Sequence, residues 1–148
     1  MKIELIKIGE EEIVSKICQK CIMKINAKVL TNDQINVLLN EFSPNGIISY
    51  SKKYKVYVAK NKNNEILGSG TLASNQIKGV FVDAKKLGKG IGKSIMQFLE
   101  NELKESGYKK SYLTSSIYAR DFYLKLGYKQ IKVIESIVGK MIAMEKVI

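Results

Sequence analysis

Three glycines at alternate positions, Gly88, Gly90 and Gly92, lie in a lysine-rich loop between two apolar segments. The run 77–82 is typical of a buried strand, and the segment 91–103 repeats apolar residues at helical spacing. Glycines between a strand and the first turn of a helix let the backbone approach a ligand closely. The free N–H groups of that turn attract anions. The sequence therefore predicts a phosphate-binding loop here.

The spacing of these glycines excludes two common phosphate motifs. A nucleotide triphosphate loop, Gly-x4-Gly-Lys-Ser/Thr, would need glycine at Leu87 to precede Gly92, Lys93 and Ser94. A dinucleotide loop, Gly-x-Gly-x-x-Gly, beginning at Gly88 would need glycine at Lys93. Each motif fails by one position. Two interpretations of the loop remain: it binds a different phosphate ligand, or it is a glycine-rich turn that only packs.

The side chains available for catalysis are few. The chain has no histidine, which excludes Ser-His-Asp and Cys-His catalysis. Cys18 and Cys21 form a Cys-x-x-Cys pair, but a zinc site needs about four ligands, and no other cysteine is present. Both cysteines share helical spacing with Ile17 and Ile22, so we expect them to be buried structural residues. We expect no metal site.

The composition favours a folded domain with a basic surface. The chain has 148 residues, of which 45% are hydrophobic, and its net charge is +11. We expect one domain spanning residues 1–148. The basic residues are spread along the chain, and Arg120 is the only arginine. We therefore do not expect a nucleic-acid partner, although the charge would attract a small polyanion. With no apolar run of ~20 residues and no signal-peptide pattern at the N-terminus, we expect no membrane association and a cytoplasmic location.

The elements that position the glycine loop read as mixed α/β (α+β) with one central sheet. Strands are predicted at 2–7, 54–60, 66–73, 77–82, 110–114, 128–134 and 138–147, and helices at 10–27, 34–41, 91–103 and 117–126. The segment 42–51 receives no assignment. This order predicts a mostly antiparallel sheet of six or seven strands flanked by about four helices. The strands on either side of the 91–103 helix should be parallel because a right-handed crossover joins them.

Two motifs in this order carry a resemblance to a known family. The stretch 87–92, Leu-Gly-Lys-Gly-Ile-Gly, resembles the loop Gln/Arg-x-x-Gly-x-Gly/Ala of the GNAT N-acetyltransferases, with Leu87 at the usual Gln/Arg position. The stretch 116–128 resembles the family's Asn/Ser-x-x-Ala-x-x-Phe-Tyr-x-x-x-Gly-Phe/Tyr motif at the family's separation. The hairpin 57–73 also fits. The resemblance covers residues 54–134 well, and the first 50 residues only by element order.

The resemblance implies a site for acetyl-CoA. The sheet would splay between its fourth and fifth strands, and pantetheine would lie in the gap, pairing with the backbone of Phe81 and Val82. The Val82 N–H would polarise the acetyl carbonyl, Tyr123 would act as general acid on the leaving thiolate, and Ser116 would bond the pantetheine arm. The pyrophosphate would be held by the loop and the helix start, residues Leu87, Gly88, Lys89, Gly90, Ile91, Gly92, Lys93 and Ser94.

The resemblance leaves the general base unassigned. The family often places a glutamate early in the strand before the loop, where this chain has Asn75 and Gln76. Asp83, Glu41, or a water relay through Tyr50 or Tyr57 are the alternatives.

The implied activity is acetyl transfer from acetyl-CoA to a primary amine by direct attack in a ternary complex. Two alternatives are a catalytically silent acyl-CoA-binding protein and a basic nucleic-acid-binding module. The acceptor is a small-molecule or peptide amine, such as a polyamine, an antibiotic, an amino acid or a protein amine. A homodimer is possible because dimers are common in the family.

Overall fold

The computed structural model describes residues 1–25 and 28–148. Seven strands form one sheet in the order β1-β2-β3-β4-β5-β7-β6. The strands are β1 (Lys2–Leu5), β2 (Lys55–Lys60), β3 (Ile66–Ala73), β4 (Gln76–Val82), β5 (Lys110–Ser116), β6 (Lys129–Ser136) and β7 (Gly139–Val147). Every pairing is antiparallel except β4 with β5, which is parallel. The predicted mixed sheet and its single parallel crossover are confirmed.

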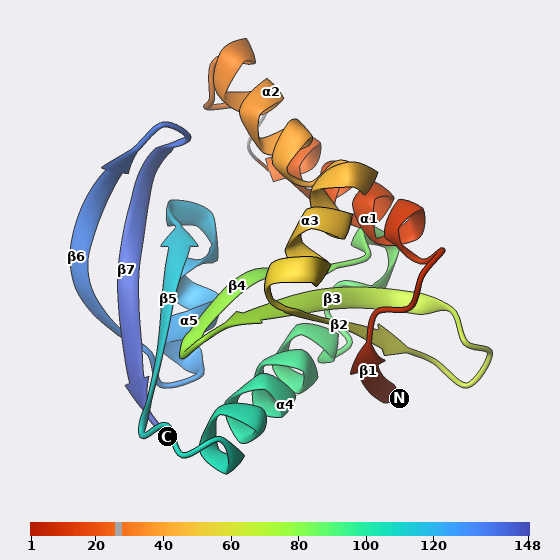
Figure 1. Ribbon diagram of the computed structural model, residues 1–148. Helices are drawn as coiled ribbons and strands as arrows, with labels where there is room; N and C mark the ends of the chain where they lie inside the picture. The colour runs from red at the N-terminus through yellow and green to blue at the C-terminus, as the bar shows by residue number, and fades with distance from the viewer. Residues whose placement is uncertain (26–27) are drawn as a thin grey trace.

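Helices cover both faces of the sheet (Figure 1). They are α1 (Glu11–Ile25), α2 (Asn32–Glu41), α3 (Pro44–Lys53), α4 (Ile91–Glu105) and α5 (Arg120–Lys125), with short 3₁₀ turns at Ala84–Lys86 and Ile117–Ala119. One core cluster joins α4 and α5 to the sheet through residues such as Leu99 and Tyr123. A second cluster joins α1 and α3 to the other face through residues such as Val14 and Ile47. The predicted end of the first helix, near Ala27, lies outside the described residues.

Most of the unassigned segment 42–51 belongs to a helix, α3 (Pro44–Lys53), which is the main addition to the predicted elements. Ser43 is its N-cap and accepts the Gly46 N–H at 3.1 Å, and Pro44 occupies the first turn, where its missing N–H costs nothing. A Cβ at Gly46 would lie 2.0 Å from the Glu41 carbonyl oxygen, so only glycine allows α2 and α3 to approach this closely. Ser-Pro-Asn-Gly is also a turn composition, so the sequence alone does not decide between a turn and a helix start here.

The other differences are local. The predicted helix 117–126 begins as a 3₁₀ turn, Ile117–Ala119, and α5 itself starts only at Arg120. The Ser116 hydroxyl accepts the Ala119 N–H at 3.3 Å and so favours the tighter turn. β3 contains a bulge beside Gly68, because Ala59 pairs with Gly68 whereas the next residue of β2, Lys60, pairs with Ile66. Gly70 lets α4 lie close to the strand. A Cβ at Gly70 would lie 2.8 Å from Leu99 Cδ1.

Candidate active site

The two parallel strands β4 and β5 pair over only a short length. Their register contains Gln76 with Tyr112 and Ile77 with Leu113, and no later pair. Beyond Ile77 the two strands separate, as Figure 1 shows. The rest of β4 therefore presents an edge without a strand partner toward β5. Unpaired strand edges can bind an extended ligand through its amides.

A β-bulge lies in this free part of β4. Ser69 pairs with Phe81, whereas Thr71, two residues further along β3, pairs with Lys78, three residues back in β4. The extra residue falls at Gly79 or Val80, and Gly79 has φ +56°. The left-handed conformation explains a glycine at this position. The bulge breaks the regular alternation of backbone groups just where the strands part.

Val82 faces the gap with its backbone. The Asp83 N–H donates to the Leu67 carbonyl at 2.8 Å, so in an antiparallel ladder the groups of the preceding residue, Val82, point away from β3. The Phe81 carbonyl instead lies toward β3, 2.6 Å from where a Cβ of Gly68 would stand. Of the two residues predicted to contact pantetheine, Val82 presents its backbone to the gap and Phe81 presents its carbonyl to β3.

The glycine loop ends in an uncapped helix N-terminus. The N-cap of α4 is Gly90, at φ 77°, and no side chain caps the helix. The Ser94 N–H donates to the Gly90 carbonyl at 3.0 Å, which is the first helical bond. The N–H groups of Ile91, Gly92 and Lys93 therefore have no helical acceptor and add to the positive end of the helix dipole.

The loop leaves room at this helix end. Gly88 and Gly90 both have positive φ, and a Cβ at either would meet no atom within 4 Å. Leu87 is 55% exposed, and Lys89 and Lys93 are also exposed. Neither lysine forms an ion pair with any residue of the described part of the chain. The loop combines free N–H groups, open space and unpaired positive charge.

Gly92 brings this anion site next to the β4 edge. A Cβ at Gly92 would lie 3.2 Å from the Phe122 ring and 3.5 Å from Val82 Cγ2. The first turn of α4 is thus packed between α5 and the end of β4. The helix N-terminus and the gap between β4 and β5 form one continuous region of the molecule.

Tyr123 lies in α5 beside this region. Tyr123 is 9% exposed, and its ring makes edge contacts with the rings of Phe122 and Tyr128 at centroid distances of 5.1 and 5.9 Å. Burial raises the pKa of the Tyr123 hydroxyl to about 12. Within residues 1–25 and 28–148, the Tyr123 hydroxyl makes no side-chain hydrogen bond. Every fully buried polar side-chain atom in that part of the chain has a partner, so this hydroxyl is not fully buried. A neutral, unpartnered hydroxyl is available to a ligand.

Ser116 ends β5 and begins the turn that leads to α5. As the cap of the 3₁₀ turn it accepts the Ala119 N–H, and its own carbonyl accepts the Ser115 hydroxyl at 2.6 Å. The structure thus gives Ser116 a part in directing the chain from β5 into the helix that carries Tyr123. Its predicted bond to a pantetheine arm stays a prediction.

The two cysteines differ in a way that the sequence did not reveal. Cys18 is 1% exposed, and burial raises its thiol pKa to about 12. Cys21 is half-buried, and its thiol donates to the Val82 carbonyl at 3.1 Å. The predicted burial holds for Cys18 and only in part for Cys21, which contacts the β4 edge. Among the described residues, no group of three or more His, Cys, Asp or Glu side chains is placed to hold a metal.

The candidate bases lie in different places. The Asp83 carboxylate accepts the Lys85 N–H at 3.0 Å and caps the first 3₁₀ turn. Tyr57 belongs to the core cluster on the α4 side and donates to Glu102 at 3.0 Å. Tyr50 donates to Glu41 on the α1 and α3 side. Glu41 and Tyr50, which are separate candidates for the base in the sequence analysis, therefore form one hydrogen-bonded pair.

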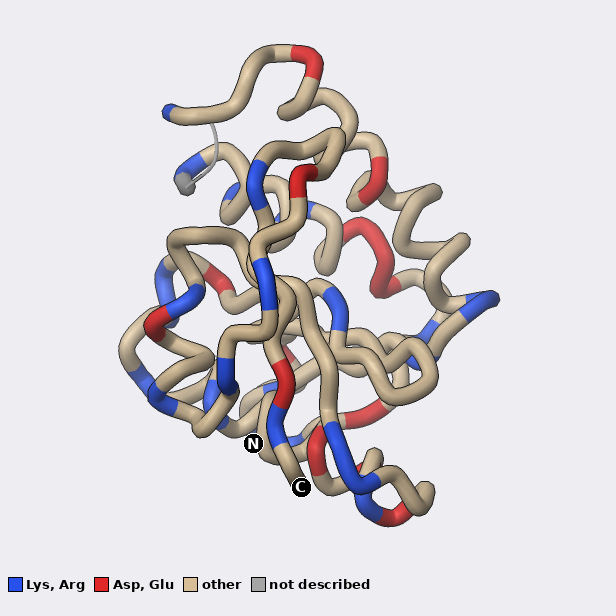
Figure 2. Tube along the Cα trace, turned by 90° about the vertical axis from the view of Figure 1, so that its left-hand side faces the viewer, with Lys and Arg blue, Asp and Glu red and all other residues tan. Residues whose placement is uncertain are grey.

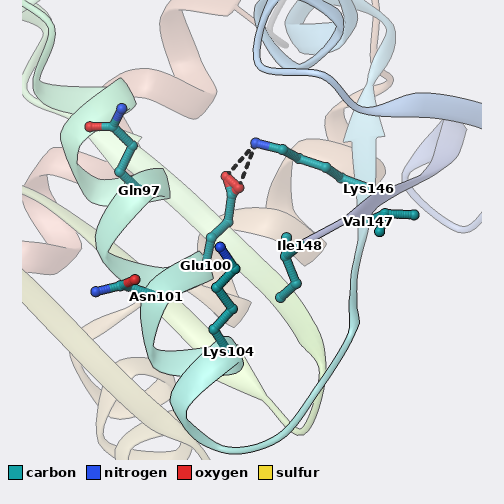
Figure 3. A pocket seen from close by; sticks show the side chains of 7 residues that line it. All are labelled: Gln97, Glu100, Asn101, Lys104, Lys146, Val147 and Ile148. Carbon is teal, nitrogen blue, oxygen red and sulfur yellow. Dashed lines mark hydrogen bonds and ion pairs between the residues drawn. The ribbon is translucent and has the colours of Figure 1, made fainter.

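A cavity of about 360 Å³ lies elsewhere, between the C-terminal half of α4 and the end of β7. Figure 3 shows its central feature, the Glu100 carboxylate bound by Lys146. Lys146 Nζ lies 2.9 Å from both carboxylate oxygens, and Glu100 is only 8% exposed. Because these charges already satisfy one another, we assign the pair to holding α4 on the sheet rather than to catalysis.

The basic residues do not gather on one element. Figure 2 shows lysine and arginine positions on strands, helices and loops on several sides of the molecule. None of the described helices is long and apolar enough to cross a membrane.

A family model for the acetyltransferase (GNAT) domain matches residues 26–146. The chain belongs to the GNAT acetyltransferase family. Among curated proteins, none matches this chain. Solved GNAT structures share its fold. A GCN5-related N-acetyltransferase from Rhodopseudomonas palustris has a TM-score of 0.85 and 16% identity, covering 99% of this chain and 95% of its own.

Two further similar structures contain coenzyme A or its acetyl form. The PaiA N-acetyltransferase from Thermoplasma acidophilum, in complex with coenzyme A, has a TM-score of 0.76 and 18% identity over 100% of both chains. A GNAT phosphinothricin acetyltransferase from Sinorhizobium meliloti, in complex with AcCoA, has a TM-score of 0.75 and 13% identity. That match covers 99% of this chain and 88% of the other. The predicted fold, with its sheet splayed between β4 and β5, is confirmed as the GNAT fold.

Proposed function

We propose that the protein transfers an acetyl group from acetyl-CoA to a primary amine. One observation carries the proposal: the free β4 edge at Val82 lies directly against an uncapped helix N-terminus, so one extended ligand with a diphosphate can engage both. Acetyl-CoA has that combination of an amide-bearing arm and a diphosphate. Membership of the acetyltransferase family and the coenzyme A complexes of similar structures support the choice of ligand.

The diphosphate would bind at the glycine loop. Free N–H groups of Ile91, Gly92 and Lys93 would donate to it, and the lysine side chains of residues 89 and 93 would add positive charge. Gly88 and Gly90 keep this space clear. Ser94 lies in the first turn and is half-buried, within reach of the same anion. Leu87 has no polar side-chain group to contribute, so binding would rest on the backbone donors.

The pantetheine arm would extend along β4, with Val82 as its main backbone partner and Ser116 on the opposite strand. The Val82 N–H would donate to the acetyl carbonyl oxygen. When the amine nitrogen attacks the carbonyl carbon, negative charge develops on that oxygen, and a fixed donor stabilises it. The C–N bond forms and the C–S bond breaks. The amine loses a proton to solvent or to a base, and the sulfur leaves as the thiolate of coenzyme A.

Tyr123 would donate its O–H to the departing sulfur. The rise of its pKa to about 12 limits complete proton transfer, since tyrosinate would be a stronger base than a thiolate of pKa ~8.5. The same rise keeps the hydroxyl neutral at physiological pH. We therefore assign Tyr123 a hydrogen bond to the developing thiolate, with the proton arriving in full only as the products separate.

Calorimetry with acetyl-CoA, followed by a free-thiol assay across an amine panel, tests the proposal. We expect binding, and thiol release that depends on both acetyl-CoA and an amine. The absence of heat with any acyl-CoA would refute the proposal. Binding without thiol release for any amine would favour a silent acyl-CoA-binding protein. Salt-dependent DNA binding without acetyl-CoA binding would favour the nucleic-acid module.

A further inference from the structure

Four aromatic rings form a connected series on the α1 and α3 side of the sheet. Phe81 of β4 meets Phe42 edge-on at 4.9 Å, Phe42 stacks on Tyr50 at 5.8 Å, and Tyr50 meets Tyr54 at 5.8 Å, all between ring centroids. We call Phe81, Phe42, Tyr50 and Tyr54 the aromatic row. All four are half-buried, so each contributes surface to the solvent as well as to the core.

The aromatic row begins at the bulge in β4. A Cβ at Gly79 would lie 3.3 Å from Phe42 Cε1 and 3.3 Å from Phe81 Cε2, so both rings lie over the bulge glycine. The row is on the opposite face from α4, because Phe42 and Phe81 pack against the cluster of α1 and α3. An acetyl donor held by the N-terminus of α4 and a second substrate on the row would therefore reach the β4 edge from opposite faces.

A carboxylate lies beside the two middle rings of the row, Phe42 and Tyr50. The Tyr50 hydroxyl donates to Glu41 Oε1, and Glu41 directly precedes Phe42 in the chain. Glu41 is half-buried, yet within the described residues it forms no ion pair. By contrast Glu4, Glu10 and Glu100 each bind a lysine. In a chain with 25 basic residues, a half-buried carboxylate bonded only to a tyrosine is a ready partner for a cation.

Two ammonium groups lie at the Tyr54 end of the row. Lys78 Nζ is 5.6 Å from the Tyr54 ring centroid, and Lys53 Nζ is 5.9 Å from the same centroid. Neither lysine forms an ion pair with a described acidic side chain. The aromatic row thus has a carboxylate beside its two middle rings, Phe42 and Tyr50, and two ammonium groups at its Tyr54 end.

We propose that the aromatic row is the acceptor site and that it selects a primary amine carrying an anionic group. The inference rests on the proposed acetyl transfer. The ammonium would bind Glu41, which Tyr50 holds in place, and a carboxylate several bonds away would bind Lys78 and Lys53. The chain between the two charges would lie on the rings. Polyamines place a second positive charge against the two lysines and are poor substrates for that reason.

Three acceptors of matched length test the selection: 6-aminohexanoate, hexylamine and 1,6-diaminohexane. We expect KM to be about tenfold lower for 6-aminohexanoate than for hexylamine, because the carboxylate gains one partly buried ion pair. We expect KM to be highest for the diamine, because the two lysines repel its second ammonium group. Lys78→Met should raise KM for 6-aminohexanoate and leave KM for hexylamine unchanged. Glu41→Gln, which keeps the Tyr50 bond, should raise KM about tenfold for both.

The control is Glu102→Gln. Tyr57 donates to Glu102 as Tyr50 does to Glu41, but Tyr57 belongs to the core cluster on the α4 side. That variant should change no KM. Preference for the diamine, or an unchanged KM in Glu41→Gln, would overturn the inference while acetyl transfer stands.

An NMR titration of the tyrosine ring signals with 6-aminohexanoate supplies a test that needs no turnover. Shifts of the Tyr50 and Tyr54 signals that are lost in Glu41→Gln would support the acceptor site even if the transfer activity failed. If neither tyrosine signal shifts at a 6-aminohexanoate concentration that saturates turnover, the site assignment is wrong.

Discussion

Replacing Tyr123 by phenylalanine separates catalysis from folding at this site. The ring is buried and keeps its edge contacts with Phe122 and Tyr128 in the variant, because those contacts involve no hydroxyl. The hydroxyl has no side-chain partner among the described residues, so its removal breaks no hydrogen bond. We therefore expect the free energy of unfolding to change by less than about 0.5 kcal/mol.

The expected loss of turnover follows from the role assigned to the hydroxyl. Because its pKa is raised to about 12, it acts as a hydrogen-bond donor to the developing thiolate rather than as a full proton donor. Removing one preorganised donor to transition-state charge costs about 10²–10³ in kcat, or about 2.7–4 kcal/mol. The raised pKa also predicts that Tyr123 itself causes no loss of activity with rising pH below about pH 11, so Tyr123→Phe should lower the pH–rate profile without changing its shape.

The matched control is Tyr128→Phe. The Tyr128 hydroxyl bonds the Ser111 hydroxyl at 2.8 Å, and Ser111 is fully buried. This variant leaves a buried polar group unpaired, so it should lose about 1–3 kcal/mol of stability and little turnover. Thiol release under saturating acetyl-CoA, with urea unfolding of each variant, measures both effects. A Tyr123→Phe turnover within threefold of the native protein would refute the assigned role.

Three further predictions address the loop, the thiol and the acid stability. Gly90→Ala should cost about 1 kcal/mol of stability because Gly90 has φ 77°, and it should weaken acetyl-CoA binding measured by calorimetry because its Cβ enters the open loop. Cys21 should react slowly with a thiol reagent at pH 8, since burial raises its pKa, and more slowly still with acetyl-CoA bound, since it touches the Val82 carbonyl. Hydrogen bonds from Lys60 and Lys2 lower the pKa of Glu4 from 4.5 to about 2. The charged carboxylate therefore stabilises the fold above pH 4.5 and loses this effect toward about pH 2, so the urea midpoint of Glu4→Gln should fall less steeply over that range.

The sequence predicted the parts of the site that depend on local patterns. Glycines with positive φ, such as Gly88 and Gly90, and an amphipathic helix that follows them leave a periodic signal. The parallel pairing of β4 and β5 followed from the crossover rule once that helix was placed. These features are encoded within about 40 consecutive residues, and neighbouring side chains decide them.

Other parts could not be read because they depend on residues far apart in the chain. The bulge at Gly79 is defined by its register with β3, and the Cys21 thiol reaches Val82 across 61 positions. α3 was missed because Ser-Pro-Asn-Gly is equally a turn and a helix start, and only the close approach of Gly46 to Glu41 decides between them. The pairing of Tyr50 with Glu41 depends on the placement of that helix.

The proposed chemistry explains how the chain can function without histidine. The groups that the proposed chemistry needs most are backbone N–H groups, which every residue except proline supplies. What the sequence must specify is where those N–H groups are left without a partner. A bulge at Gly79, a divergence after Ile77 and a glycine N-cap at Gly90 achieve this with backbone geometry alone. In the proposed mechanism, catalysis therefore depends mainly on the positions of glycines, and acceptor selection on the charged and aromatic side chains of the aromatic row and its neighbours Glu41, Lys53 and Lys78.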